Sequence, residues 1–143
     1  MLSAKQVCRI AGLDYARLDY WARSGFLKPS INEASGKGSK RLYSFIDLLS
    51  IKVAKKLRDE GVSLQKLRKV IDYVYKHRQD IESPLANLVL ITDGENIFEL
   101  TSDPNIMVDI LKSGQLIFAF AVDKLVDSAK NMLKKEGIEG IAI

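Results

Sequence analysis

Cysteine and histidine are nearly absent from this 143-residue chain, which holds one of each, Cys8 and His77. A single cysteine cannot form an internal disulfide framework, and such sparing use fits a reducing cytoplasm. Metal sensors and iron–sulfur centres need clusters of cysteine or histidine, and nucleophilic catalysis needs a base beside the nucleophile. Neither arrangement is available in the sequence, so we expect no metal, no cofactor and no enzymatic activity.

Long apolar runs are also missing. No run approaches the roughly 18 residues that a membrane-spanning helix needs, so we expect no membrane partner. The first 15 residues contain Ser3, Lys5 and Gln6 rather than a basic patch followed by an apolar block, and we expect no signal peptide. The chain is still 47% hydrophobic and 28% charged, which is enough apolar material for a folded core.

Charge is distributed unevenly along the chain. Residues 1–82 hold 17 Lys and Arg against 9 Asp and Glu, a net +8. Residues 83–143 hold 5 against 9, a net −4. A basic half indicates an anionic polymer as partner, although a solvated surface of uneven charge explains the same numbers.

Two short helices are predicted near the N-terminus. Ser3 with Gln6 three residues later is a capping-box pattern, and Gly12 ends the helix that follows. Asp14 caps a second helix that ends at about Ser24. Helix, short glycine-containing turn and helix together are typical of a helix-turn-helix motif.

Residues 26–43 have a different pattern. Pro29 stops any helix, and the runs FLKPSI and KRLY are short and extended, with NEASGKGS between them. We expect a β-hairpin with a basic tip, and we call residues 32–41 the wing segment.

Two longer helices follow the wing segment. Ser44 with Asp47 caps the third helix and Gly61 ends it, whereas Ser63 caps a fourth helix that runs to about His77. The apolar residues fall at helical spacing and predict one buried face on each helix. They are Leu48, Leu49, Val53 and Leu57 in the third helix and Leu64, Leu67, Val70, Ile71 and Val74 in the fourth.

Beyond a predicted linker, DIESPL, the acidic half has the pattern of a small ββαβα unit. LVLITDGENIFEL contains two apolar runs around Asp93-Gly94, a strong signal for a hairpin. Asp103-Pro104 starts a predicted helix that runs to Lys112, since proline is favoured in the first turn. LIFAFAV fits a buried strand, and a last helix is predicted over about 124–136.

These elements predict an α+β fold with two domains. Residues 1–79 would form a four-helix winged helix-turn-helix domain that binds DNA, and residues 84–143 a small ββαβα domain for dimerisation or effector binding.

The run GKGSK in the wing segment raises the alternative of a nucleotide-binding loop. A P-loop needs G-x-x-x-x-G-K-[ST] between a strand and a helix. Here Gly36-Lys37 is followed by Gly38, and Ile31 stands where the first glycine is required. We therefore interpret the loop as the tip of a wing. Its glycines allow a close approach to a DNA backbone, with countercharge from Lys37, Lys40 and Arg41. A basic loop that is merely solvated is the alternative.

Residues 2–75 resemble the N-terminal domain of MerR-type transcription regulators. The resemblance rests on three ordered groups of residues. They are LDYWAR-x-GFL with Pro29, then Arg41-Leu42-Tyr43, then Leu57, Gly61, Ser63, Leu64, Leu67 and Arg68. The whole chain is similar to an actinobacterial MerR-like subgroup that shares LDYWAR-x-G, RLYSF-x-D and a C-terminal DG…GQ-x-x-F.

The resemblance implies a dimeric DNA-binding protein and gives roles to particular residues. Tyr15 and Arg17 would lie near the N-terminus of the recognition helix, with Tyr20 and Arg23 behind them and Arg41 in the wing. An arginine there can bind guanine with two hydrogen bonds, and a tyrosine hydroxyl can donate to phosphate. Four large apolar side chains are assigned to the core instead: Leu18, Trp21, Phe26 and Leu42.

Two departures from the family pattern stand out. The family's arginine after the leucine is Asp19 here, which we expect to pair with Arg23 four residues later; contact with a cytosine amino group is the alternative. No heptad run follows His77, so the compact C-terminal unit replaces the family's long dimerising helix. For that unit we favour dimerisation over a ligand pocket or contact with another protein.

The function predicted from the sequence is sequence-specific transcription regulation in the cytoplasm, at the nucleoid. A homodimer would bind a pseudo-palindromic promoter site on double-stranded DNA and, as the resemblance implies, act with RNA polymerase. The alternative is an architectural DNA-bending factor like the phage excisionases, whose winged helix is similar.

Overall fold

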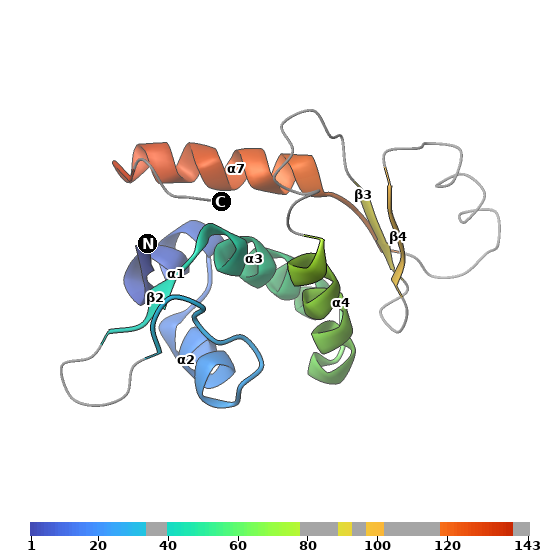
Figure 1. The fold of residues 1–143 in the computed structure, drawn as a ribbon, viewed down its shortest axis with the longest axis horizontal. Helices are drawn as coiled ribbons and strands as arrows, with labels where there is room; N and C mark the ends of the chain where they lie inside the picture. Colours follow the sequence, from blue (N-terminus) through green and yellow to red (C-terminus); the bar gives the residue numbers. More distant parts are fainter. Residues whose placement is uncertain (34–39, 78–88, 93–96, 102–117, 139–143) are drawn as a thin grey trace. The chain divides into compact units, whose positions relative to one another are not determined.

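The computed structural model describes residues 1–33, 40–77, 89–92, 97–101 and 118–138 (Figure 1). Residues 1–55 and those from 127 onward form one compact unit, and residues 56–126 form a second. Helices and short strands occur together, which confirms the predicted α+β class. In the described part of the chain, no helix is both long enough and apolar enough to cross a membrane.

Helices α1 (Ala4–Ala11) and α2 (Tyr15–Arg23) begin at the predicted caps. The Ser3 hydroxyl accepts from the Gln6 backbone N–H at 3.2 Å, and the Gln6 side chain accepts from the Ser3 N–H at 2.9 Å. Gly12 ends α1 with a φ of 67°, a left-handed conformation that glycine adopts without a Cβ clash. The Asp14 carboxylate accepts from the Arg17 N–H at 2.7 Å and starts α2.

The strand pairing near the wing segment differs from the prediction. Strand β2 (Leu42–Tyr43) pairs with β1 (Leu2–Ser3), antiparallel, and not with a strand in residues 26–31. Those six residues form no strand, and only Asn32 makes a bridge to Leu42. Pro29 lacks an N–H for pairing, and the Ser30 N–H donates instead to the Asp47 carboxylate at 2.9 Å. The predicted tip, residues 34–39, lies outside the described residues.

Helices α3 (Phe45–Asp59) and α4 (Leu64–Lys76) carry the predicted apolar faces. Ser44 and Asp47 make reciprocal hydrogen bonds at the start of α3, and Ser63 caps α4. Most of the predicted core positions on both helices are buried; Leu64 is half-buried. Helix α3 is also buried on a side that the sequence did not predict, since Ser50, Ile51 and Ala54 are fully buried too.

The three strands predicted in the acidic half are present. Strands β3 (Val89–Thr92), β4 (Ile97–Thr101) and β5 (Phe118–Ala121) form an antiparallel sheet in the order β4-β3-β5. Helix α7 (Val122–Lys135) follows β5 without a loop and begins two residues before its predicted start. The linker, the Asp93-Gly94 turn and the helix expected between Asp103 and Lys112 fall outside the described residues, so the two predicted domain boundaries stay predictions.

The described end of the chain belongs to the first compact unit. Arg9 of α1 forms a salt bridge with Glu136 at 2.5 Å, and Lys52 of α3 donates to the Ser128 hydroxyl at 3.3 Å. Burial lowers the pKa of Lys52. In α7, Ala129 is fully buried and Leu133 is 6% exposed. The C-terminal half of α7 is thus held against α1 and α3, within the unit that also contains α2 (Figure 1).

Candidate nucleic-acid interface

Helix α2 presents two faces of different character. Leu18 and Trp21 are buried, and the Trp21 ring meets Phe26 edge-on with ring centroids 5.3 Å apart. Tyr15 and Tyr20 lie on the outside with 58% and 54% of their surface exposed. Tyrosine combines an apolar ring with a polar hydroxyl, a composition that is enriched at binding interfaces. The three buried residues confirm the predicted core, but Leu42 is only half-buried.

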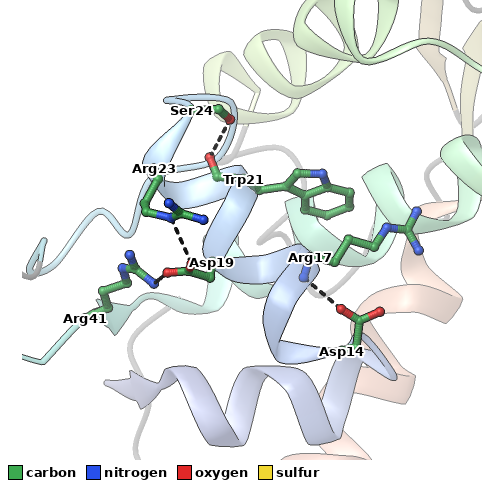
Figure 2. A network of polar contacts seen from close by, with 7 residues as sticks. All are labelled: Asp14, Arg17, Asp19, Trp21, Arg23, Ser24 and Arg41. Atoms are coloured by element: carbon green, nitrogen blue, oxygen red, sulfur yellow. Dashed lines mark hydrogen bonds and ion pairs between the residues drawn. The ribbon is translucent and has the colours of Figure 1, made fainter.

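Arg17 lies in the first turn of α2, at the edge of this surface. Its guanidinium carbon sits 5.2 Å from the centroid of the Trp21 ring, a cation–π distance (Figure 2). Its backbone N–H donates to the Asp14 carboxylate at the start of the helix, and the contact of its side chain with the Trp21 ring gives the side chain its direction. A planar guanidinium fixed near the N-terminus of an exposed helix is suited to a base edge in the major groove.

A cluster of three charged side chains lies at the border between α2 and the wing segment (Figure 2). Asp19 accepts from Arg23 Nε at 2.8 Å, which confirms the predicted pair four residues apart. Asp19 also accepts from Arg41 Nη1 at 2.7 Å, a contact that sequence reasoning missed. The side chain of Arg23 is 68% exposed, whereas that of Arg41 is 16% exposed.

Each charge in the cluster stabilises its partner. The hydrogen bond from Arg41 has the largest effect and lowers the pKa of Asp19; burial, the next largest, raises it, and the charges of Arg23 and Arg41 lower it further, so that the pKa stays below its ordinary value. The same hydrogen bond raises the pKa of Arg41. Asp19 and Arg41 are therefore ionised at neutral pH, and two guanidinium groups against one carboxylate give the cluster a net positive charge.

The described part of the wing segment is anchored at its base. The Asn32 side chain donates to the Lys40 carbonyl at 2.7 Å, and the backbones of Asn32 and Leu42 exchange hydrogen bonds of 3.2 and 2.9 Å. Lys40 itself is exposed, next to Arg41. Lys37, the third predicted cation of the wing, lies outside the described residues.

The chemistry of this surface is that of anion and base recognition. Guanidinium and ammonium groups donate to phosphate oxygens, tyrosine hydroxyls add neutral donors, and the exposed face of α2 carries no acid except Asp19, which is paired. Among the residues that the structure describes, no three His, Cys, Asp or Glu side chains are grouped to hold a metal ion.

Comparison with known proteins identifies a family that carries the same helix-turn-helix motif. Residues 2–74 match the family model of the MerR HTH family regulatory proteins, which is about half of the chain. The chain belongs to the MerR family. This is a family of regulatory proteins and not of enzymes.

Curated relatives of this MerR-family chain come from mycobacteria. Uncharacterised HTH-type transcriptional regulators of Mycobacterium tuberculosis and Mycobacterium bovis are 46% identical over 115 residues, which is 80% of this chain. The match covers 49% of the relatives, so the chain spans about half the length of the curated proteins it matches. These relatives agree with the resemblance to an actinobacterial MerR-like subgroup.

Cys8 is not part of the interface of this MerR-family protein. It lies half-buried in α1, and burial, followed by the charge of Asp14, raises the pKa of its thiol. A thiol with a raised pKa is mostly protonated at neutral pH and reacts slowly, since the thiolate is the reactive form. A structural role as a small side chain therefore fits Cys8 best.

Proposed function

We propose that this MerR-family protein is a DNA-binding transcription regulator that acts as a homodimer on a pseudo-palindromic promoter site. One observation carries the proposal: α2 exposes Tyr15, Tyr20 and Arg23, while Leu18 and Trp21 anchor its opposite face in the core. A rigid helix with an exposed face of this composition matches the recognition helix of a helix-turn-helix protein.

In the proposed complex, α2 lies in the major groove. Arg17 contacts a base edge from the first turn, and Tyr15, Tyr20 and Arg23 contact the flanking backbone or bases. Lys40 and Arg41, together with Lys37, lie along phosphates from the wing segment. The four-helix winged domain of residues 1–79 would thus supply affinity through phosphates and sequence preference through α2.

The proposed dimer places two such surfaces on DNA of two-fold symmetry. Residues 84–143, interpreted as a ββαβα domain, would provide the dimer contact, because the small sheet can pair across a two-fold axis. A promoter-bound dimer that bends or untwists its site would act on RNA polymerase through the shape of the DNA. A chromosomal target also places the protein in the cytoplasm, at the nucleoid.

Genome-wide mapping of binding sites tests this function directly. We expect a limited set of sites in promoter regions, each with a dyad whose half-sites are separated by about one helical turn. Purified protein should shift a duplex carrying such a site as a dimer. Broad coverage with little sequence preference would instead identify an architectural DNA-bending factor, and no binding to any duplex would reject both functions.

A further inference from the structure

Asp19 is an unexpected residue on a surface that is proposed to bind DNA. A carboxylate repels phosphate, and on electrostatic grounds alone it weakens binding at this face. Its contacts are nevertheless specific: each carboxylate oxygen accepts from a different arginine, at 2.7 Å and 2.8 Å (Figure 2). The two arginines come from segments that the chain must bring together, because Arg23 ends α2 and Arg41 precedes β2.

The contacts of Asp19 can also favour DNA binding, because they order two arginine side chains. An arginine side chain in solution samples many rotamers, and ordering it on binding costs free energy. Asp19 holds both guanidinium groups in the unbound protein, and the Arg41 side chain is only 16% exposed. One hydrogen bond does not exhaust a guanidinium, which has five N–H donors, so a held arginine can still donate to phosphate.

We propose that Asp19 is a positioning residue for DNA binding: it ties the base of the wing segment to α2 and orders Arg23 and Arg41 before DNA arrives. Asp19 acts through the two arginines and does not itself touch DNA. This inference rests on the proposed DNA-binding function. It adds a role for an acidic residue within a basic interface.

The substitution Asp19→Asn distinguishes positioning from repulsion, because the two roles predict opposite changes in the affinity for DNA. Removing a carboxylate that only repels phosphate raises affinity. Removing a carboxylate that orders two arginines lowers it, and we expect a loss of about two- to tenfold. The control is Asp72→Asn, which removes the same charge from an exposed position on α4 that has no part in the proposed interface; its affinity should be unchanged or slightly higher.

The measurement is a DNA titration of the full chain, using a duplex with a mapped site and a mixed-sequence duplex at several salt concentrations. Combining Asp19→Asn with Arg41→Ala completes a double-mutant cycle. If Asp19 acts through Arg41, the acid's substitution costs clearly less in the Arg41→Ala background than in the wild type. Thermal unfolding without DNA establishes that each variant is folded.

A second variant, Asp19→Glu, keeps the charge and lengthens the side chain. Positioning predicts weaker binding, whereas repulsion predicts wild-type affinity, and this variant decides the matter if Asp19→Asn does not fold. The inference is overturned if Asp19→Asn binds DNA as tightly as the wild type or more tightly. It is also overturned if the losses of affinity from Asp19→Asn and Arg41→Ala are fully additive. In both cases the proposed DNA-binding function stands. A wild-type protein that binds neither duplex overturns both.

Discussion

At the residue scale, Tyr43 is an unusual part of the core. Its side chain is fully buried beside the wing segment, and its hydroxyl, like that of the buried Ser50, has no hydrogen-bond partner among the described residues. Burial raises the pKa of Tyr43 to about 12, so the side chain is neutral at any physiological pH. A buried hydroxyl without a partner loses its hydration and gains nothing in return.

Removing that hydroxyl should therefore stabilise the protein. We expect Tyr43→Phe to raise the free energy of unfolding by about 1 kcal/mol, measured by urea denaturation. Tyr20→Phe is the matched control, since Tyr20 is 54% exposed and its hydroxyl is solvated. A Tyr43→Phe variant that is less stable than the wild type would show that the hydroxyl is hydrogen-bonded in solution.

Two cations of the interface should differ in what they contribute to DNA binding. Lys40→Ala should weaken binding to every sequence and reduce the slope of log affinity against log salt by about 0.9, the value for one lost phosphate contact. Arg17→Ala should relax the preference at one base pair, at a cost of about 1–3 kcal/mol. Titrations on a mapped site and on single-base variants distinguish the two. If Lys40→Ala changed the sequence preference as much as Arg17→Ala does, the assignment of Lys40 to a phosphate contact would be wrong.

At the scale of elements, Asp47 joins the start of α3 to the segment before the wing. It is 1% exposed, and its Oδ2 accepts from the Ser44 N–H, the Ser30 N–H and the Ser30 hydroxyl. The same residue thus completes the cap of α3 and binds the backbone N–H of Ser30, which is then not available for strand pairing. This contact helps to explain why residues 26–31, which the sequence predicts to be extended, do not pair as a strand.

The loss of this carboxylate should be costly for stability. Asp47→Ala removes the cap of α3 and leaves three partly buried donors of Ser30 and Ser44 without their shared acceptor, and we expect the free energy of unfolding to fall by about 2–4 kcal/mol. Asp72→Ala, the same change at an exposed position on α4, should change it by less than about 0.5 kcal/mol. Thermal or urea unfolding followed by circular dichroism compares the two, and a mild effect at Asp47 would mean that Ser30 and Ser44 find other acceptors.

Helix α7 offers a second test at this scale. Leu133 is 6% exposed, and Leu133→Ala should destabilise the unit formed by residues 1–55 and 127 onward by about 2–5 kcal/mol. Lys134→Ala, at the exposed neighbouring position, is the control and should be close to neutral. Hydrogen exchange at amides of α1 reports the same effect locally: faster exchange there is expected only for Leu133→Ala. Unchanged protection of α1 would show that α7 is not held against it in solution.

At the scale of the whole molecule, local signals predicted most elements but not their long-range partners. Ser3, Asp14 and Ser63 mark helix starts by chemistry within three residues, and the strands β3 and β4 follow from two apolar runs around Asp93-Gly94. Strand β1 has two residues, too few for any periodicity, and its pairing with β2 spans the helices α1 and α2.

In the interface, too, the sequence predicts local contacts but not contacts between distant residues. The pair of Asp19 with Arg23 lies on one helix face and follows from spacing alone. The pair of Asp19 with Arg41 joins residues 22 apart in sequence, and nothing in the local pattern of either residue indicates it. The burial of α3 on its second side depends on tertiary packing in the same way, and α7 is in contact with that helix through Lys52 and Ser128.

The salt bridge of Arg9 with Glu136 joins residues 127 apart in sequence. Contacts between distant residues close large loops and slow folding, since the entropy of closure must be lost before the contact forms. During synthesis, α1, α2 and α3 leave the ribosome long before residues 127–136 exist. The helix that completes the first unit therefore arrives last, and a nascent chain stalled before it would expose the surface that Leu133 covers to chaperones and proteases.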